Sequence, residues 1–465
     1  MSSEFSEKAK EKLEGYITKG MVEAHVPGLS IALVKNGQTV YTKGFGARNL
    51  ENNDPATPHT LYGIGSCTKS FTALAVMQLA ERGLLDVQDP VKKYLPLKLG
   101  SEEAPIRIHH LLSHSSGAPN DGMAEILIRR ATGMEDYWIP MSSFDDFMLH
   151  VNSASEEVAA EPGKRYFYYN SGFTLLGEIV ERVSGVKYED YIKEKILKPL
   201  RMSRSTFLKE EFEKDSDTMT AYRKNKDGTL TATVHPFHRF IYGPGGLLSS
   251  VTELTSYLTL NMDGGTFEGK RLVEASSMEA MHSSHIETGT GLFGKQGYGY
   301  GWSITEGFLG HRLIQHGGST GVSSAFLGFI PDEKVGVALA ANTGAFGSAV
   351  MTLGALALLL GKDPEKELPF LEIEKRLKQL EGNYESYQGI RRLSVVRKGT
   401  MLYLEEKTRF AESSVPLIPE SERLENLKFY IYSGVGAKMP VEFVVDPKGR
   451  TDLYMERWRL HKVKG

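Results

Sequence analysis

Ser66 and Lys69 are spaced so that one residue can activate the other for nucleophilic chemistry. They stand three residues apart at the start of residues 66–83, where apolar residues recur at helical spacing. Residues three apart share one face of a helix, so the Lys69 amine can meet the Ser66 hydroxyl. A serine hydroxyl becomes a good nucleophile when a neighbouring base takes its proton. Burial and the positive end of a helix both favour a neutral, basic lysine.

Two further motifs, each present once, follow this pair along the chain. Tyr168 and Asn170 form the single Tyr-x-Asn, and His316 begins the single His-x-Gly. Acyl transfer needs a nucleophile, a proton shuttle and hydrogen-bond donors for the developing oxyanion. Tyr168 is expected to share proton handling with Lys69, and either residue can be the base for Ser66. Asn170 is expected to bind a substrate amide or to steady Lys69.

Two other residues, Ser184 and Cys67, could be taken for the nucleophile but are given structural interpretations. Ser-x-x-Lys recurs at Ser184, but Ser184 and Gly185 are typical of a helix end, so this match is read as chance. Cys67, the one cysteine, excludes an internal disulfide. Adjacent helical residues point about 100° apart, so Cys67 is interpreted as a small buried hydrophobic residue rather than the nucleophile.

The three motifs, in this order, resemble those of the serine β-lactamase and D,D-peptidase superfamily, in particular its class C β-lactamase-like, CubicO-type branch. The resemblance extends through residues 111–117, 245–250 and 298–302, and covers roughly residues 26–342. It implies an α/β unit beside an all-helical unit, with the active site in the cleft between them.

The resemblance also assigns roles to residues. Ser66 is the expected nucleophile, and the strand ending at His316 borders the site, where a peptide would lie as an added strand. The backbone N–H groups of Ser66 and Ser319 are expected to form the oxyanion hole, since the glycines after His316 allow close backbone approach. The expected catalytic residues are Ser66, Lys69 and Tyr168, and the expected substrate-binding residues are Asn170, His316, Gly318 and Ser319.

His316 stands where most β-lactamases carry the lysine of a Lys-Thr-Gly motif. A histidine is only partly charged near neutral pH and is a weaker anchor for a substrate carboxylate, so efficient β-lactamase action is not expected. Peptidase, D-aminopeptidase-like and esterase members of the branch carry His-x-Gly. Two roles are open: a charged contact for a carboxylate, or a neutral ring that orients Tyr168 or a water.

Two other patterns receive structural interpretations. Residues 317–321 fit the Gly-x-Ser-x-Gly elbow, but that elbow requires a helix to follow, and residues 322–330 have a strand pattern. His110 and His114 are four apart and could share a metal, but no third ligand is evident. Both are interpreted as satisfied structural histidines, and neither a metal nor another cofactor is expected.

The composition is that of a soluble globular protein. The chain has 465 residues, 40% hydrophobic and 24% charged, with a net charge of −3 that gives no reason to expect nucleic-acid binding. Residues 1–19 lack the apolar core of a signal peptide, and the longest apolar run, 349–360, is shorter than the roughly 20 residues that span a bilayer. A cytoplasmic protein without a membrane partner is expected.

Residues 1–360 are predicted to form a β-lactamase-like catalytic domain of the α/β class. Its expected fold is an antiparallel sheet flanked by helices, with an all-helical subdomain from the mostly helical residues 106–260. The predicted strands are residues 30–34 and 40–42, joined by the hairpin turn Asn36-Gly37, and residues 302–305, 313–316, 325–330 and 335–341.

The composition changes near residue 361. Residues 361–382 are charged and contain two prolines, which predicts a linker, and residues 383–465 alternate apolar and polar residues between turns. This alternation predicts a small antiparallel β-barrel or sandwich. The archaeal CubicO-type peptidases that the chain resembles carry a lipocalin-like barrel here. We interpret it as a packing module without a ligand, whose edge strands favour a homo-oligomer.

These observations predict a serine hydrolase that acts through an acyl-enzyme on peptide amide bonds, in peptides with D-amino acids or a blocked end. A carboxylesterase or weak β-lactamase on the same site is the alternative, because the acyl-enzyme chemistry is shared. A catalytically silent binding or scaffold protein is the alternative from another class. The intact Ser66, Lys69 and Tyr168 argue against it.

Overall fold

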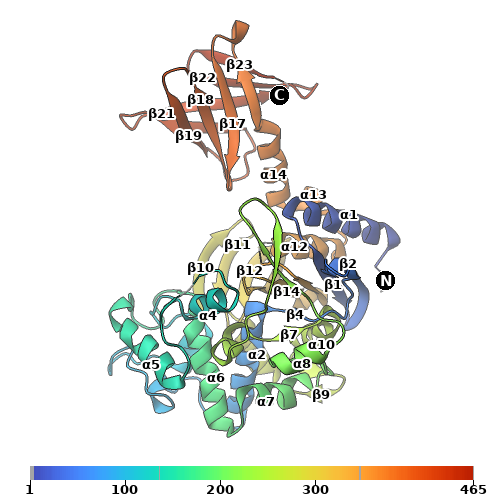
Figure 1. Cartoon of the computed structure of the whole chain (residues 1–465), viewed down its shortest axis with the longest axis vertical. Coiled ribbons are helices and arrows are strands. Elements are labelled where there is room, and N and C mark those ends of the chain that lie inside the picture. Colours follow the sequence, from blue (N-terminus) through green and yellow to red (C-terminus); the bar gives the residue numbers. More distant parts are fainter. Residues whose placement is uncertain (1–4, 136, 345–346, 464–465) are drawn as a thin grey trace. The chain divides into compact units, whose positions relative to one another are not determined.

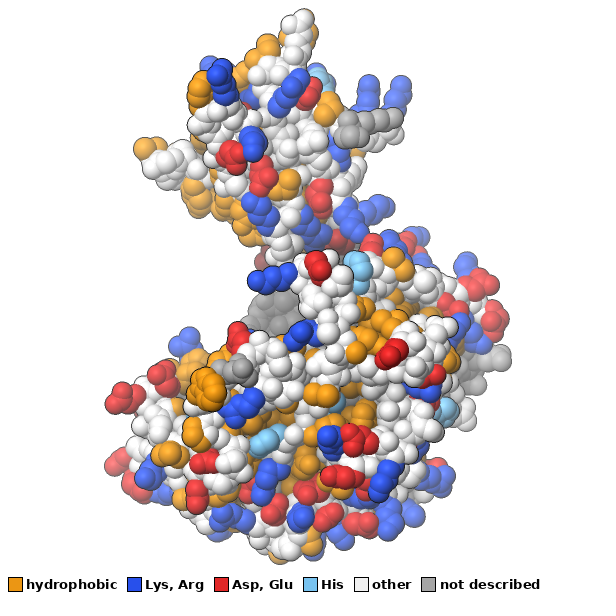
Figure 2. Space-filling model, in the orientation of Figure 1, with side chains coloured by type: hydrophobic (Ala, Val, Ile, Leu, Met, Phe, Trp, Pro, Cys, Tyr) orange, Lys and Arg blue, Asp and Glu red, His pale blue; other side chains and the backbone are white. Residues whose placement is uncertain are grey.

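The computed structural model describes residues 5–135, 137–344 and 347–463, so the outermost ends of the two predicted domains lie outside it. The chain divides into two compact units, Met1–Lys362 and Asp363–Gly465, and each has its own apolar core. Basic and acidic side chains are interspersed over the face shown in Figure 2. Within the described ranges, no helix is both long enough and apolar enough to cross a bilayer.

The first unit contains one antiparallel sheet of nine strands (Figure 1). Their order is β10-β11-β12-β13-β14-β15-β1-β2-β3, so N-terminal and late strands share one sheet, as the sequence predicts. The strands are β1 (Gly28–Lys35), β2 (Gln38–Asn49), β3 (Asp54–Pro55), β10 (Ile286–Gly291), β11 (Gly294–Tyr298), β12 (Ser303–Phe308), β13 (His311–Ser319), β14 (Ser324–Ile330) and β15 (Val335–Ala341). Strands β10 and β11 were not predicted from the sequence, because both are rich in glycine and β10 is largely exposed.

Strands β14 and β15 are buried along their whole length, and β1 along all but its last residue, because helices cover both sheet faces. Gly336 of β15 faces Leu258 of α10 (Val251–Met262), whereas Gly328 of β14 faces Leu356 of α12 (Ser348–Leu359). Gly328 pairs with Val337, the neighbour of Gly336, and successive strand residues point to opposite faces. The two helices therefore lie on opposite faces, and α1 (Glu7–Ala24) packs on α12.

The remaining helices of this unit include α2, whose residues 68–79 are all buried. Short strands also occur in the segment that was expected to be mostly helical. The helices are α2 (Thr68–Glu81), α3 (Ile108–Leu112), α4 (Met123–Ala131), α5 (Phe144–Ser153), α6 (Asn170–Ser184), α7 (Tyr188–Ile192), α8 (Lys209–Lys214), α9 (Tyr242–Gly245) and α11 (Ala275–His282). The short strands are β4 (Tyr62–Gly63), β5 (Ala221–Lys224), β6 (Leu230–Thr233), β7 (Leu248–Ser249), β8 (Thr266–Phe267) and β9 (Lys270–Arg271).

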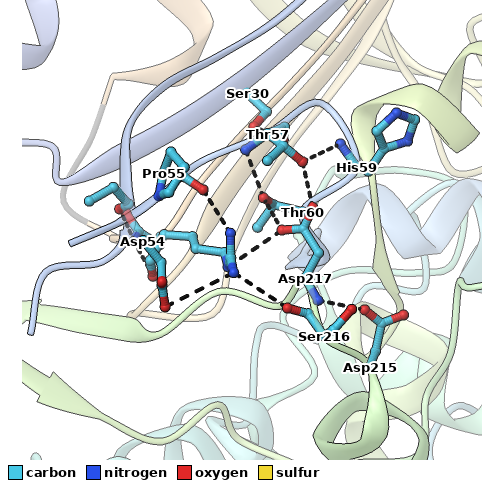
Figure 3. A network of polar contacts seen from close by, with 12 residues as sticks. Ser30, Asp54, Pro55, Thr57, His59, Thr60, Asp215, Ser216 and Asp217 are labelled. Atoms are coloured by element: carbon cyan, nitrogen blue, oxygen red, sulfur yellow. Dashed lines mark hydrogen bonds and ion pairs between the residues drawn. The ribbon is translucent and has the colours of Figure 1, made fainter. Parts of the chain in front are cut away.

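A polar network fixes the segment that leads to Ser66 (Figure 3). The hydroxyls of Thr57 and Thr60 donate to the two carboxylate oxygens of Asp217 over 2.5 and 2.6 Å. The N–H of Leu61 donates to the backbone carbonyl of Asp217 over 2.8 Å. Strand β4 begins directly afterwards and pairs with β7, so the chain enters the Ser66 turn from a well-anchored position.

The second unit is a closed eight-stranded antiparallel barrel preceded by two helices. Its interior is filled by apolar side chains that alternate along the strands, such as Phe429, Val441 and Leu453, as the sequence pattern predicts. The elements are α13 (Pro364–Glu367), α14 (Pro369–Leu380), β16 (Gly382–Glu385), β17 (Arg392–Lys398), β18 (Met401–Lys407), β19 (Glu412–Pro419), β20 (Lys428–Tyr432), β21 (Lys438–Val445), β22 (Thr451–Met455) and β23 (Trp458–Val463).

Two expectations about this unit are modified by the structure. Residues 361–382, which the sequence predicts to be a linker, contain α13 and α14, and the second unit begins at Asp363. The barrel is closed by pairing of β16 with β23, so its described strands leave no open edge. Edge pairing was therefore the wrong physical reason for expecting a homo-oligomer, because closure removes the edges.

Candidate active site

Ser66 lies in a short 3-10 turn, η1 (Gly65–Cys67), that runs directly into α2. The helix predicted to start at Ser66 thus begins as a tighter turn, in which residues three apart still share a face. Lys69 is fully buried in the first turn of α2, and its Nζ lies 2.9 Å from Ser66 Oγ. The structure therefore brings together Ser66 and Lys69, one of the two residues that the sequence leaves open as its base.

Lys69 has two further polar partners, each of which can only accept a hydrogen bond. Its Nζ lies 2.9 Å from Oδ1 of Asn170, the first residue of α6, and 2.7 Å from the carbonyl oxygen of Pro244 in α9. A neutral amine has two N–H donors and one lone pair. The two acceptors use both donors, which leaves the lone pair for the Ser66 hydroxyl. Burial lowers the pKa of Lys69 well below its usual range, in agreement with a neutral amine.

Tyr168 is the third member of this group. Burial raises the pKa of its phenol far above the usual value, and a hydrogen bond with Ser66 opposes that rise only in part. Lys69 Nζ lies 4.7 Å from the centre of the Tyr168 ring. The phenol is therefore protonated when the Lys69 amine is neutral, an arrangement that provides one proton acceptor and one proton donor around a single hydroxyl.

His316 makes two hydrogen bonds within the protein. Its Nδ1 lies 2.7 Å from the carbonyl oxygen of Gly317, which can only accept, so Nδ1 carries the ring proton. Its Nε2 then accepts from the hydroxyl of Tyr298, at the end of β11, over 2.8 Å. Burial lowers the pKa of His316 to about 3. The imidazole is thus neutral, with both nitrogens occupied by the protein.

Two glycines allow strand β13 to lie directly against the Ser66 turn. A Cβ on Gly318 would lie 1.9 Å from the carbonyl oxygen of Ile64, and a Cβ on Gly65 would lie 2.5 Å from the backbone nitrogen of Ser319. Gly65 also has a φ of 52°, which favours glycine. This close approach brings the backbone of Ser66 and Ser319 together, so their N–H groups can serve a single oxyanion.

A carboxylate that the sequence analysis did not identify lies near these residues. Glu125 is in the first turn of α4, and its Oε1 accepts from the side chain of Asn120 over 3.0 Å. Its Oε2 is buried, without a hydrogen-bond partner in the part of the chain that the structure describes. The charge of Glu125 acts on both Lys69 and Tyr168, adding to the raised pKa of the phenol and opposing the effect of burial on the amine.

The competing patterns have structural explanations. Cys67 is fully buried, its thiol lies 3.1 Å from the carbonyl oxygen of His316, and burial raises its pKa to about 12. Ser184 ends α6. Residues 317–319 are the end of β13, and strand β14 rather than a helix follows the next turn, so no nucleophile elbow forms. His110 accepts from the N–H of Arg107 over 3.1 Å. Among the described residues, no three His, Cys, Asp or Glu side chains are grouped as metal ligands.

Comparison with known proteins adds two family matches. A family model described as beta-lactamase matches residues 13–361, and one described as Pab87 octamerisation domain matches residues 364–461. The chain is also similar to the solved octameric penicillin-binding protein homologue from Pyrococcus abyssi. The two are 44% identical with a TM-score of 0.91, over 97% of this chain and 99% of that one.

More distant relatives match part of the chain. Protein flp of Staphylococcus aureus strain MW2 is 26% identical over 338 residues, which are 72% of this chain and 63% of the relative. The chain thus spans less than two thirds of that protein. Penicillin-binding protein 4* of Bacillus subtilis is 25% identical over 333 residues, 67% of each chain. A penicillin-binding protein from Bacillus halodurans, 24% identical with a TM-score of 0.60 over 74% of this chain and 99% of that one, shares the fold.

Proposed function

The chain belongs to the beta-lactamase family, and from this membership and the geometry around Ser66 we propose that it is a serine hydrolase working through an acyl-enzyme. The observation that carries the proposal is the contact set of Lys69. Asn170 and Pro244 occupy the two donors of the neutral amine and leave its lone pair for Ser66. A protein that only binds a partner has no need for a buried lysine held in this way.

In the acylation step, Ser66 Oγ attacks the carbonyl carbon of the substrate while Lys69 Nζ takes the hydroxyl proton. The carbonyl π bond opens, and its oxygen becomes an oxyanion that the N–H groups of Ser66 and Ser319 stabilise. Tyr168 then donates its phenolic proton to the leaving group as the bond to the carbonyl carbon breaks. The proton held by Lys69 restores the phenol. Water releases the acyl group by the same route in reverse.

The charges near Ser66 support a substrate class. His316 and Lys69 are both neutral, and Glu125 adds a negative charge nearby. Such a site disfavours a carboxylate close to the scissile bond, which β-lactams carry, and favours a blocked end or a free amine. We therefore propose peptide amides as substrates. The preference for D-amino acids rests on the resemblance to D-aminopeptidase-like members, and a carboxylesterase remains the second candidate because ester cleavage uses the same steps.

The test compares kcat/KM for a D-alanyl peptide amide, the same peptide with a free carboxylate, its methyl ester and a β-lactam. We expect the amide and the ester to exceed the free acid, and the β-lactam to be the poorest substrate. The L-alanyl amide is the matched control for stereochemistry. Turnover of the free acid or the β-lactam above that of the blocked peptides would contradict the proposed substrate class.

We further propose that the chain forms a homo-oligomer through its barrel, with eight copies as in the Pyrococcus abyssi relative. The match to an octamerisation domain over residues 364–461 supports this proposal. Because the barrel is closed, its outward side chains rather than strand edges must make the contacts. Ile390, Phe410 and Val435 are apolar and 70%, 89% and 92% exposed in the structure, which makes them candidates for burial between copies.

A further inference from the structure

His114 differs from the satisfied structural histidine that the sequence analysis expects. It follows α3, is fully buried, and has a left-handed backbone with a φ of 56°. Its Nδ1 accepts a hydrogen bond, but its Nε2 has no hydrogen-bond partner within the described ranges. A buried residue in a rarely populated conformation, with one unpaired nitrogen, needs an explanation beyond packing.

His114 holds the residues on both sides of Tyr168. Its backbone carbonyl accepts from the N–H of Phe167 over 2.9 Å, and its ring Nδ1 accepts from the N–H of Tyr169 over 3.0 Å. Tyr169 has extended backbone angles, φ −123° and ψ 98°, and α6 begins at the next residue. The two hydrogen bonds therefore fix the backbone on both sides of Tyr168, and with it the position from which the Tyr168 side chain projects.

The ring of His114 also contacts the Tyr168 ring itself. Their centres are 4.2 Å apart, and the rings of Tyr298 and Phe173 lie 4.7 and 5.1 Å from His114. Since Nδ1 accepts from a peptide N–H, the single ring proton lies on Nε2. Burial lowers the pKa of His114 well below its usual range. The His114 ring is thus neutral, accepts a hydrogen bond at Nδ1, and packs against the Tyr168 ring.

We propose that His114 is a positioning residue for Tyr168, which holds the phenol at Ser66 by accepting the N–H of Tyr169 and packing against the phenol ring. This inference rests on the proposed function of Tyr168 as proton donor to the leaving group. Small displacements of a catalytic group are costly, because proton transfer needs hydrogen-bond distance in the transition state. The left-handed backbone of His114 is what lets its carbonyl and its ring reach residues 167 and 169 together.

Substrates whose leaving groups differ in their need for a proton distinguish this role of His114 from a merely structural one. A peptide anilide expels a basic amine that needs a proton, whereas a p-nitrophenyl ester expels a stable anion that does not. His114→Leu removes the acceptor for Tyr169 while keeping an apolar side chain of similar size. We expect it to lower kcat for the anilide by about 10- to 100-fold, up to the lower end of the roughly 10²- to 10⁴-fold that proton transfer contributes, and to leave ester acylation nearly unchanged.

His114→Asn and His114→Gln provide the matched pair. The Asn side chain places its oxygen near the position of Nδ1, and Asn tolerates a left-handed backbone better than most residues. The longer Gln side chain places its polar atoms near Nε2. We expect Asn to recover anilide turnover and Gln to behave like Leu. This pair keeps the proposal testable even if His114→Leu fails to fold.

A fluorophosphonate separates failure of this inference from failure of the proposed function. If the wild-type chain is not labelled at Ser66, the proposed function fails and the inference fails with it. If wild type and folded variants are labelled, but anilide and ester turnover fall by the same factor, only the role of His114 is overturned. Equal anilide turnover by the Asn and Gln variants would overturn it as well.

Discussion

The hydroxyl of Tyr298 lies 2.8 Å from Nε2 of His316, where a neutral imidazole can accept a hydrogen bond from it. With Nδ1 directed at the carbonyl of Gly317, the ring has no free nitrogen for a substrate. Of the two roles that the sequence leaves open for His316, this geometry supports the neutral one. The hydrogen bond also ties β13, which borders Ser66, to the end of β11.

A neutral His316 predicts that carboxylate binding does not follow histidine titration. Burial lowers the pKa of His316 to about 3, so the ring has already lost its proton at higher pH and its charge stays constant. KM for a free-acid peptide and for its methyl ester should therefore vary in parallel between about pH 5 and pH 9. Initial rates over this range test it. A rise in KM between about pH 6 and 8 for the acid alone would restore the charged anchor.

If Lys69 is the base for Ser66, the pH profile of kcat/KM should have a single acid limb. Below its pKa the ammonium has no lone pair, so Ser66 keeps its proton and the rate falls; burial places this limb below the ordinary lysine range. Burial raises the pKa of Tyr168, so no alkaline limb is expected below about pH 10. Tyr168→Phe should lower the plateau and keep the limb. Loss of the limb in Tyr168→Phe would make Tyr168 the base instead.

Gly318→Ala should damage the oxyanion hole. Its Cβ would lie 1.9 Å from the carbonyl oxygen of Ile64, so β13 must move away from Ser66. We expect kcat to fall by about 10²- to 10³-fold, the usual cost of losing one oxyanion donor. Gly317→Ala is the matched control, because its Cβ would meet the Phe326 ring at an ordinary 3.4 Å. Similar kcat values for the two variants would argue against the placement of the hole at Ser319.

Because the chain has two units, we predict that oligomerisation depends on the second unit and the reaction at Ser66 on the first. Each has its own core, so residues 1–362 should fold without the barrel and react with a fluorophosphonate at Ser66. Light scattering should give a multiple of the chain mass for the full protein and a single-chain mass for the fragment. Circular dichroism of the fragment is the control for folding. An assembled fragment, or a full chain that is a monomer, would contradict oligomerisation through the barrel.

The sequence was most informative where chemistry depends on neighbours along the chain. The spacing of Ser66 and Lys69, and the alternation in the barrel strands, are local patterns that determine local geometry. The hydrogen-bond partners of Lys69 and His316 could not be predicted from such local patterns. Pro244 contributes only a backbone carbonyl, and Tyr298 acts through a contact between two strands, so neither has a recognisable spacing. Glu125 was missed, and His114 was interpreted only as a satisfied structural histidine, for the same reason, because their surroundings are created by tertiary packing.

The central claim, that Ser66 is the nucleophile, is tested most directly by mapping the site of covalent labelling. The full chain is treated with a fluorophosphonate, digested, and analysed by mass spectrometry, with Ser66→Ala as the control. We predict one labelled peptide, modified at Ser66, and no labelling of the folded Ser66→Ala variant, whose kcat should be lower by several orders of magnitude. A label on Ser184, Ser319 or Cys67, or an equally labelled Ser66→Ala protein, would contradict the account.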